Sequence, residues 1–402
     1  MTRERFDSQL AWDDFLERLR EIGDKIVGVT GAKGPRERAE GFRYLMGLLS
    51  AGQDLEMEVD GAHPRLTRMF TPMRSFIADG VDTLYHEAKI DVNRSYVCKI
   101  ERGDDIFFSI VVYASDDEGM REMSSFLIDD DIHFEGNAAT IHISKERPAG
   151  AQNWLALSGH DPFVLTRQYF PESVVKVDEG SFREATMSIH ATPASSAPPA
   201  YDLEVLSSGL DRVVAFMQET VDSALGISAY VALNMIEYEG SESTPTRIDA
   251  SGKLIVDEER HDSHTADEIV DMIDPKVVAN NLPGPGIGYV GASYKLADDE
   301  AILVEGQKIP CRYWSCQLLD HFLRSGDYRY HVVSLNDRQI DYDSDGSFRI
   351  YASRNDPGVR NWLDTQGRRR GQVVLRTLLA ETDMDPALSV IKIADIPDRD
   401  RR

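Results

Sequence analysis

Near its start, the chain repeats apolar residues at helical spacing. Residues 8–27 predict one helix, with Ser8 as its N-cap and Gly28 just beyond its end. Pro35 has the fixed φ of a first helical turn, and a second helix is predicted from there to Gly52. We therefore expect a helical hairpin. Its buried positions are expected to be Trp12, Phe15, Leu16, Leu19, Ile22 and Ile26 in the first helix and Ala39, Phe42, Leu45, Met46 and Leu49 in the second.

From about Thr83 the apolar pattern changes from helical toward a period of two. Residues 96–100 and 106–113 predict two strands, and the second of these is apolar on both faces. Such a strand is typical of the middle of a sandwich. Further strand-like runs follow at residues 139–143 and 163–170. This region therefore predicts a first β-sandwich.

The pattern then passes through the same two stages again. Residues 191–202 are rich in Ala, Ser and Pro, cannot form a packed element, and predict a linker. Helical spacing returns at residues 203–224 and 266–280, and a second β region starts near Tyr289. Its strands are expected at residues 301–304, 313–319, 330–333, 348–351 and 372–376.

An internal repeat relates the two β regions. Asn153-Trp154-Leu155 in the first region recurs as Asn361-Trp362-Leu363 in the second. Upstream, Phe107-Phe108-Ser109 can be set against Tyr313-Trp314-Ser315, and downstream Arg167 matches Arg376. Each repeat is then a unit of roughly 70 residues of antiparallel strands, the size of a sandwich or jelly roll.

These patterns predict an α+β fold with two duplicated antiparallel, jelly-roll-like β-sandwiches. The expected domains are an N-terminal helical hairpin (1–56), a first β-sandwich (57–190), a linker (191–202), a helical connector (203–284) and a C-terminal jelly-roll-like domain (285–402).

Composition narrows the classes of partner. The chain has 69 Asp and Glu against 44 Lys and Arg, a net charge of −25, which repels nucleic acid phosphates and anionic lipids. No apolar run reaches the length of a membrane span, and residues 1–16 lack the apolar core of a secretory signal. We expect a cytoplasmic protein with no nucleic acid or membrane partner.

The three cysteines, Cys98, Cys311 and Cys316, form no CxxC pair and have no nearby His at zinc-finger spacing. Reduced thiols are therefore expected, without a disulfide framework or a structural zinc site.

The second repeat resembles a known bacterial family. Residues 356–367, read Asp-Pro-Gly-Val-Arg-Asn-Trp-Leu-Asp-Thr-Gln-Gly and preceded by Tyr313-Trp314-Ser315, resemble the family catalogued as domain of unknown function 1214. Residues 77–85 resemble the Asn-x-Asp-Thr-Leu-Tyr element of its frequent companion, domain of unknown function 1254, with Gly80 in place of the Asn. The resemblance implies jelly-roll sandwiches with a helical section between them, and it implies no activity or catalytic residues.

A polar cluster next to the first β region is one candidate site. Tyr85 or His86 could form an acid/base pair with Asp82 if these side chains line a cleft. The alternative is a polar corner between helix and sheet.

The second repeat offers candidate residues for substrate binding: Trp362, Arg376, Asn361 and Tyr313. The indole could stack on a ligand, or it could plug a sheet end while the amide satisfies backbone groups. Arg376 and Arg167 could each bind an anion, or could each form a structural ion pair.

Three further motifs do not support a metal or a cofactor. Residues 341–346 match the first half of a calcium loop, but position twelve is Ala352, and a hairpin turn explains the same residues. Residues 286–291 spell GxGxxG without a preceding strand, which favours a loop. His261-Asp262-Ser263-His264 lies in a charged run typical of solvated chain. We predict no metal and no cofactor.

Two functions remain open. The first is a cofactor-independent enzyme of the hydrolase or lyase type. It would act on a small carbohydrate-like or hydrophobic metabolite in a cleft between the β lobes, with Asp82, Tyr85 and His86 transferring protons. The second is a non-catalytic ligand-binding or assembly protein, with homo-oligomerisation as a further expectation.

Overall fold

The computed structural model describes residues 3–30, 34–194, 196–198, 200–231, 235–236, 246–248, 254–255 and 284–402. The chain divides into two compact units. The first comprises Met1–Phe76, Thr83–Phe170 and Glu179–Asp222, and the second comprises Ile77–Asp82, Pro171–Asp178 and Ser223–Arg402. The helix predicted at 266–280 and the His261-Asp262-Ser263-His264 motif lie outside the described residues.

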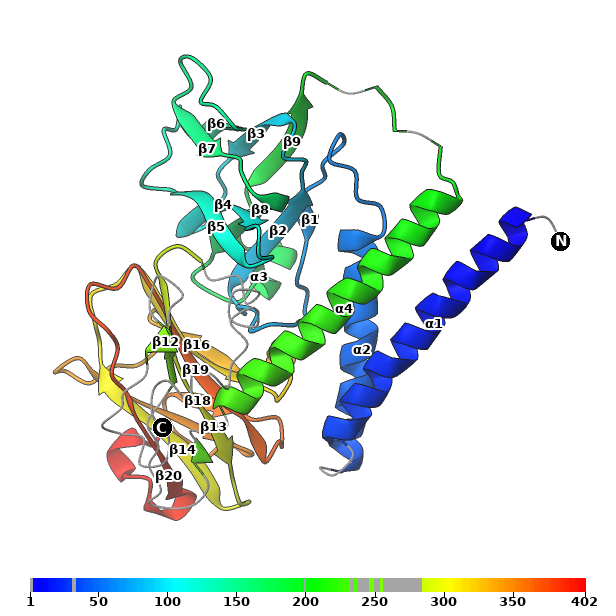
Figure 1. Ribbon diagram of the computed structural model, residues 1–402. Helices are drawn as coiled ribbons and strands as arrows, with labels where there is room; N and C mark the ends of the chain where they lie inside the picture. The colour runs from blue at the N-terminus through cyan, green and yellow to red at the C-terminus, as the bar shows by residue number, and fades with distance from the viewer. Residues whose placement is uncertain are drawn as a thin grey trace. The chain divides into compact units, whose positions relative to one another are not determined.

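Helices of the first unit pack side by side (Figure 1). They are α1 (Arg3–Thr30), α2 (Pro35–Glu56) and the part of α4 (Leu203–Val231) that belongs to this unit. Arg18 of α1 forms an ion pair with Asp211 of α4 at 2.8 Å. Gly52 of α2 allows a close approach to α4, because a Cβ there would lie 2.9 Å from Val213. In the described part of the chain, no helix combines the length and apolarity needed to cross a bilayer.

The helical hairpin exists, and in α1 Phe15, Ile22 and Ile26 are buried as predicted, but α2 buries a different face from the predicted one. In α2 the buried positions run through Gly41, Tyr44, Leu48 and Ala51, and the expected core residue Phe42 is exposed. The residues predicted to be buried that are instead exposed are Trp12, Leu16, Ala39, Phe42 and Met46. The prediction was wrong because both helices carry apolar residues around more than one face, and periodicity does not say which face finds a partner. Helix α1 also continues through Gly28.

The first unit contains a β-sandwich. Its five-stranded sheet has the order β1-β2-β8-β4-β5, and its four-stranded sheet has the order β7-β6-β3-β9. Alternate apolar residues of the two sheets form one core, including Phe108, Ile110, Ile141 and Ile189. The strands are β1 (Thr67–Arg68), β2 (Thr83–Lys89), β3 (Ser95–Glu101), β4 (Phe107–Ser115), β5 (Arg121–Ile128), β6 (Ala138–Ser144), β7 (Asn153–Ala156), β8 (His160–Tyr169) and β9 (Thr186–Thr192).

The second unit contains another sandwich. Its larger sheet has the order β12-β11-β13-β19-β15-β16, with β10 also pairing with β13, and its smaller sheet has the order β18-β17-β14-β20. The strands are β10 (Met235–Ile236), β11 (Thr246–Ile248), β12 (Leu254–Ile255), β13 (Ile287–Lys295), β14 (Glu300–Gln307), β15 (Tyr313–Leu319), β16 (Ser334–Asn336), β17 (Ser347–Ser353), β18 (Trp362–Asp364), β19 (Arg370–Leu378) and β20 (Ala387–Lys392). The short helices are α3 (Val175–Asp178), η2 (Ile393–Asp395) and η3 (Asp398–Asp400).

The two sandwiches have the same strand order. The run β2-β8-β4-β5 corresponds to β13-β19-β15-β16, and β7-β6-β3-β9 corresponds to β18-β17-β14-β20. In both smaller sheets the first of these strands pairs in parallel with its neighbour, whereas the other ladders of these runs are antiparallel. The predicted α+β fold with two sandwich-like domains is confirmed.

Two local predictions in the second unit were wrong. Residues 330–333 form turns and extended chain, and the strand there is β16. The GxGxxG run is not a loop, because β13 begins at Ile287 and includes Gly288 and Gly291. Position 291 favours glycine, because the carbonyl oxygen of Val373 on β19 lies only 3.3 Å from where a Cβ would stand.

Candidate functional site

A short segment of the chain, Ile77–Asp82, is held inside the second unit. Ile77 and Ala78 have φ values of 46° and 51°, a region that non-glycine residues rarely adopt and that costs about 1–3 kcal/mol per residue. The surrounding unit holds this conformation. Ala78 donates its N–H to the carbonyl of Leu323 at 2.7 Å, and Arg376 donates to the carbonyl of Ala78 at 2.5 Å.

Asp79 is a buried carboxylate in this segment, with 1% of its surface exposed. One oxygen accepts the N–H of Ser325 at 3.0 Å and the other accepts the Ser325 hydroxyl at 2.7 Å. Gln317 of β15 donates to the Asp79 carbonyl at 2.7 Å. Burial raises the pKa of Asp79 to about 6, although Ser325 and the positive charge of Arg376 act in the opposite direction.

Asp82 ends the segment and is also buried. Its Oδ1 accepts the Tyr313 hydroxyl at 2.7 Å and its Oδ2 accepts the Asn336 amide at 2.8 Å. Asn336 also donates to the carbonyl of Pro171 at 2.9 Å. Burial raises the pKa of Asp82, and burial together with the Asp82 charge raises the pKa of Tyr313. All four carboxylate oxygens of the two aspartates therefore accept hydrogen bonds from this chain.

Arg376 supplies the positive charge of this cluster. It lies on β19, directly opposite Ser315 on β15 and Tyr289 on β13. Its charge partly offsets the rise in the pKa of Asp79 and Asp82 that burial causes. Its guanidinium lies 5.3 Å from the centre of the Tyr289 ring. The cluster is a buried, cross-linked network of two carboxylates, one guanidinium and neutral donors.

The structure brings together three of the predicted site residues, Asp82, Tyr313 and Arg376. Tyr85 and His86 belong to the first unit, on β2. The Tyr85 ring packs edge-on against Phe70, with ring centres 4.8 Å apart. Burial, together with the charge of Arg68, lowers the pKa of His86 to about 4, so its imidazole is neutral at pH 7.

Asn361 and Trp362 lie on the other sheet of the second sandwich. The Asn361 amide donates to the carbonyls of Asp341 and Arg349, each at 2.9 Å, and accepts the N–H of Asp341 at 2.9 Å. The Trp362 indole donates to the Ser353 hydroxyl at 3.0 Å. The Asn361 contacts satisfy backbone groups, which is the structural alternative that the sequence left open for this amide.

The first repeat makes the same contacts. Asn153 bonds to both backbone groups of His133 and to the carbonyl of Thr140, and Trp154 donates to Ser144. We call this arrangement the Asn-Trp clamp, formed by Asn153 and Trp154 in the first unit and by Asn361 and Trp362 in the second. Its presence in both units indicates a structural role.

Residues 341–346 form a turn. The N–H of Gly346 donates to the carbonyl of Asp343 at 2.9 Å, and the Asp343 carboxylate pairs with Arg349 and Arg360. Asp345 accepts the hydroxyl of Ser347 at 2.6 Å. These carboxylates therefore bind arginine and turn donors. Across the described residues, no group of three or more His, Cys, Asp or Glu side chains could hold a metal ion.

Sequence reasoning missed four members of the buried network: Asp79, Gln317, Ser325 and Asn336. Asp79 lies inside the 77–85 segment that the family resemblance singled out, so attention to that whole segment could have found it. The other three lie far away in sequence and in no motif, and only the fold brings them to the aspartates.

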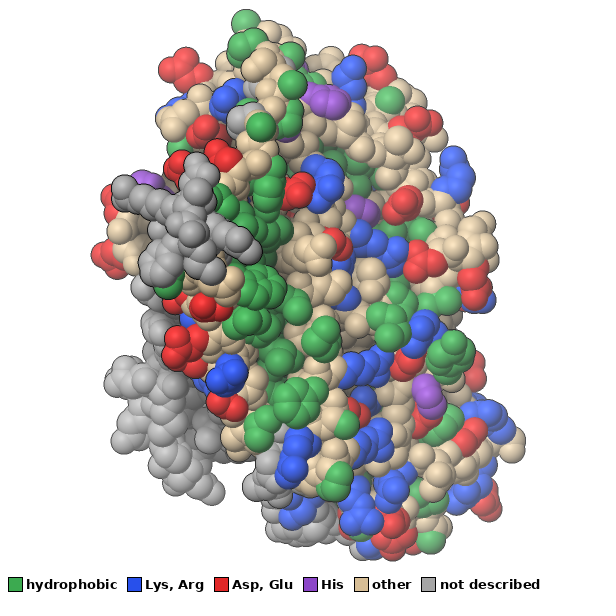
Figure 2. All heavy atoms as spheres, turned by 90° about the vertical axis from the view of Figure 1, so that its right-hand side faces the viewer, with side chains coloured by type: hydrophobic (Ala, Val, Ile, Leu, Met, Phe, Trp, Pro, Cys, Tyr) green, Lys and Arg blue, Asp and Glu red, His purple; other side chains and the backbone are tan. Residues whose placement is uncertain are grey.

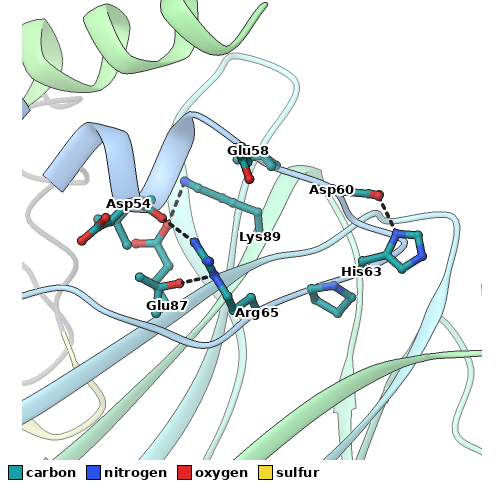
Figure 3. Close-up of a pocket in the computed structure, with 11 residues that line it drawn as sticks. Asp54, Glu58, Asp60, His63, Arg65, Glu87 and Lys89 are labelled. Atoms are coloured by element: carbon teal, nitrogen blue, oxygen red, sulfur yellow. Dashed lines mark hydrogen bonds and ion pairs between the residues drawn. The ribbon is translucent and has the colours of Figure 1, made fainter. Parts of the chain in front are cut away.

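A separate pocket lies in the first unit (Figure 3). Its volume of about 30 Å³ suits one or two water molecules rather than a metabolite. Lys89 lies 2.8 Å from Glu56 at the end of α2 and 2.9 Å from Glu87 on β2. These two carboxylates raise the pKa of Lys89 despite its burial, so it stays protonated and cannot act as a nucleophile. Glu87 and Lys89 line the pocket, and the ion pair between Lys89 and Glu56 ties sheet to helix.

A known family matches the C-terminal part of the chain. A family model described as "Protein of unknown function (DUF1214)" matches residues 292–382. This range lies in the second unit and confirms the predicted resemblance there. No curated protein matches the chain.

Two solved structures are similar to this one. A crystal structure of an uncharacterised protein from Burkholderia cenocepacia has a TM-score of 0.79 and 24% identity, covering 96% of this chain and 98% of the other. A protein from Vibrio parahaemolyticus has a TM-score of 0.47 and 14% identity, covering 87% of this chain and 98% of the other. The Burkholderia likeness shows a shared fold.

Proposed function

We propose that the protein is a non-catalytic assembly protein whose N-terminal helices pair with a second copy of the chain. The observation that carries this proposal is the exposed apolar surface of α1 and α2. Trp12 and Phe42 are each 47% exposed, and Met46 is 62% exposed. Figure 2 shows apolar side chains gathered on the side of the molecule that carries these helices.

The exposed apolar residues form stripes rather than isolated positions. Trp12 and Leu16 on α1, and Phe42 and Met46 on α2, are each four residues apart, so each pair lies on one face of its helix. Leu10 is also exposed, at 53%. Exposed apolar residues that share one helix face mark an interaction site more often than scattered single residues do.

Charge favours a second copy as the partner. On α1, Asp13 and Glu17 are exposed beside Trp12 and Leu16, whereas on α2 Arg43 is exposed beside Phe42. In a two-fold interface the same patch meets itself, so α1 of one copy can face α2 of the other and acidic side chains meet a basic one. A chain with a net charge of −25 needs such local complementarity to associate with itself.

The acid/base hypothesis has less support. A proton-transfer group needs an oxygen that a substrate can reach, and each oxygen of Asp82 accepts a hydrogen bond from Tyr313 or Asn336. The same is true of Asp79 with Ser325. We therefore assign this network to holding the Ile77–Asp82 segment in place.

Three finer inferences accompany the proposal. We infer an internal duplication, which the shared strand order and the Asn-Trp clamp support. Residues 77–85 are proposed to derive from the companion family, domain of unknown function 1254, because they resemble its Asn-x-Asp-Thr-Leu-Tyr element. A cytoplasmic location agrees with the three free cysteines.

The test is the mass of the full chain in solution, by sedimentation equilibrium. We expect a dimer for the natural sequence. In a Trp12→Glu, Met46→Glu double variant, the dissociation constant should rise at least tenfold, or about 1.4 kcal/mol, because charge enters an apolar contact. Tyr330→Glu is the control, since Tyr330 is 77% exposed but lies in the second unit.

A monomeric natural protein would overturn the proposal. So would equal dissociation constants for the double variant and the Tyr330→Glu control. Circular dichroism of each variant checks that both helices are retained, because a loss of helix would also abolish pairing. If helix is lost, Met46→Gln, which keeps helix propensity, replaces the double variant.

A further inference from the structure

Two basic residues lie side by side at one end of the second sandwich. Lys295 ends β13 and Arg370 begins β19, and the two are direct cross-strand partners. Tyr294 belongs to the sandwich core, so Lys295, the next residue along the strand, faces away from it. Residues directly opposite each other in a ladder share a face, and both of these residues are exposed.

Two more arginines adjoin this pair. Arg369 precedes β19, and its carbonyl accepts the N–H of Leu296 at 2.8 Å, which holds it beside the end of β13. Its guanidinium pairs with the Asp298 carboxylate at 2.8 Å, and Arg354, which follows β17, pairs with the same carboxylate oxygen. We call Lys295, Arg354, Arg369 and Arg370 the basic corner.

The acidic residues nearby do not balance the charge of the basic corner. Asp298 is a single carboxylate that two guanidinium groups share. The acidic residues at positions 299 and 300 both pair with Lys392, at 3.2 and 3.1 Å. Within the described ranges, Lys295 and Arg370 have no carboxylate partner. The basic corner therefore carries more positive charge than the chain around it neutralises.

This excess of positive charge has a physical cost that a bound anion removes. Like charges directly opposite each other in an antiparallel ladder repel, and Lys295 and Arg370 are in that arrangement. The chain has 69 acidic against 44 basic residues, so an unbalanced group of cations runs against its composition. A surface region of one sign raises the local concentration of ligands of the other sign.

We propose that the basic corner binds the diphosphate group of a small soluble molecule. One phosphate carries a charge of about −1.5 to −2 at pH 7, which balances Lys295 and Arg370. The second phosphate pairs with Arg369, whose side chain is 63% exposed. Guanidinium N–H groups match pairs of phosphate oxygens, and the ammonium adds a point charge. The net charge of −25 repels an anionic membrane surface, so the ligand is a soluble one.

The experiment is isothermal titration calorimetry of the full chain with inorganic pyrophosphate at low ionic strength, and with sulfate as a single divalent anion. We expect one pyrophosphate per chain and at least tenfold weaker sulfate binding. Lys295→Glu should weaken pyrophosphate binding at least tenfold, because it replaces a ligand contact by a like charge. The same change places opposite charges across the ladder, so β13 and β19 stay paired.

Lys308→Glu is the matched control. Lys308 is exposed and belongs to the same unit, but it follows the end of β14, whereas Asp298 of the turn before β14 contacts the basic corner. This variant has the same net charge as Lys295→Glu, so it reports the effect of overall charge alone. It should bind pyrophosphate within about twofold of the natural protein, because solvent and salt screen a charge at that distance.

Four results would overturn the proposal. They are no pyrophosphate binding by the natural protein, sulfate binding as tight as pyrophosphate binding, equal losses in Lys295→Glu and Lys308→Glu, or tighter binding to vesicles that contain phosphatidic acid than to pyrophosphate. The last result would make a lipid headgroup the ligand. If circular dichroism shows that Lys295→Glu does not fold, Arg370→Gln decides the question. That variant should bind pyrophosphate about tenfold more weakly, and unchanged affinity would count against the site.

Discussion

The two sandwiches share a scaffold and differ in what surrounds one arginine. Both have the same strand order and the same Asn-Trp clamp. On the face opposite the core, however, Arg376 lies among Asp79, Asp82 and a backbone carbonyl, whereas tyrosine rings surround Arg167. The matching positions maintain the fold, and the side chains around the arginine differ at a position that both sandwiches share.

This difference bears on the candidate binding residues of the second repeat. The run Asp-Pro-Gly-Val-Arg-Asn-Trp-Leu-Asp includes two of them, Asn361 and Trp362. In the structure, Asn361 of that run holds backbone, and Arg376 acts on carboxylates from the same chain. A conspicuous motif can thus mark contacts that hold backbone in place rather than a binding site.

The two arginines offer the strongest way to break this comparison. Arg376→Met should lower the free energy of unfolding by about 3–5 kcal/mol, because Asp79 and Asp82 would lose the cation that offsets their burial. Arg167→Met should lower it by about 1–3 kcal/mol through the lost hydrogen bond to Tyr113, in addition to the other contacts of this guanidinium. Urea unfolding of the full chain measures both. Equal losses would mean that the two environments do not differ as described.

The pH dependence of stability sharpens the comparison further. The pKa of Asp79 is raised from 3.8 to about 6 in the folded protein, so the folded state holds this proton more tightly. The stabilisation is complete below pH 3.8 and is lost as pH rises through 6, a change of roughly 3 kcal/mol. Asp79→Asn removes that loss.

The measurement is the unfolding free energy of the natural protein and of Asp79→Asn at pH 4 and at pH 7. The advantage of the variant should be greater at pH 7 than at pH 4 by about 2–3 kcal/mol. A difference that stays constant between the two pH values would show that Asp79 does not titrate in this range.

The Asn-Trp clamp tests the shared half of the comparison. Asn153→Ala and Asn361→Ala should each lower the unfolding free energy by about 1–3 kcal/mol, because each removes three hydrogen bonds to backbone groups. Chemical unfolding of the two variants provides the values. A large loss for only one of them would show that the clamps are not equivalent.

Sequence alone predicted the elements that depend on local pattern. The predicted strands around Phe108 and Trp314, and the repeat that aligns Ser109 with Ser315, correspond to β4 and β15 at matching places in the two sandwiches. The face of α2 was not predictable, because Phe42 and Tyr44 are both apolar and only the packing of α4 and the sheet decides between them.

The candidate site was predictable only in part. Asp82, Tyr313 and Arg376 were chosen from separate motifs and do meet in one network. Asn336 and Ser325 were not found, because their roles depend on contacts with residues more than 240 positions away, which no local pattern records. Ser109 and Arg167 likewise become neighbours only because the sheet pairs β4 with β8, which the local pattern does not record.

The discontinuity of the two units affects the order of events during synthesis. Ile77–Asp82 belongs to the second unit but leaves the ribosome long before Tyr313, Asn336 and Arg376. Until those residues are made, Asp79 and Asp82 remain hydrated, and the flanking strand β2 can pair with β8 while its neighbouring residues have no partner. The Ile77–Asp82 segment therefore reaches its final contacts only after the C-terminal sandwich has been synthesised.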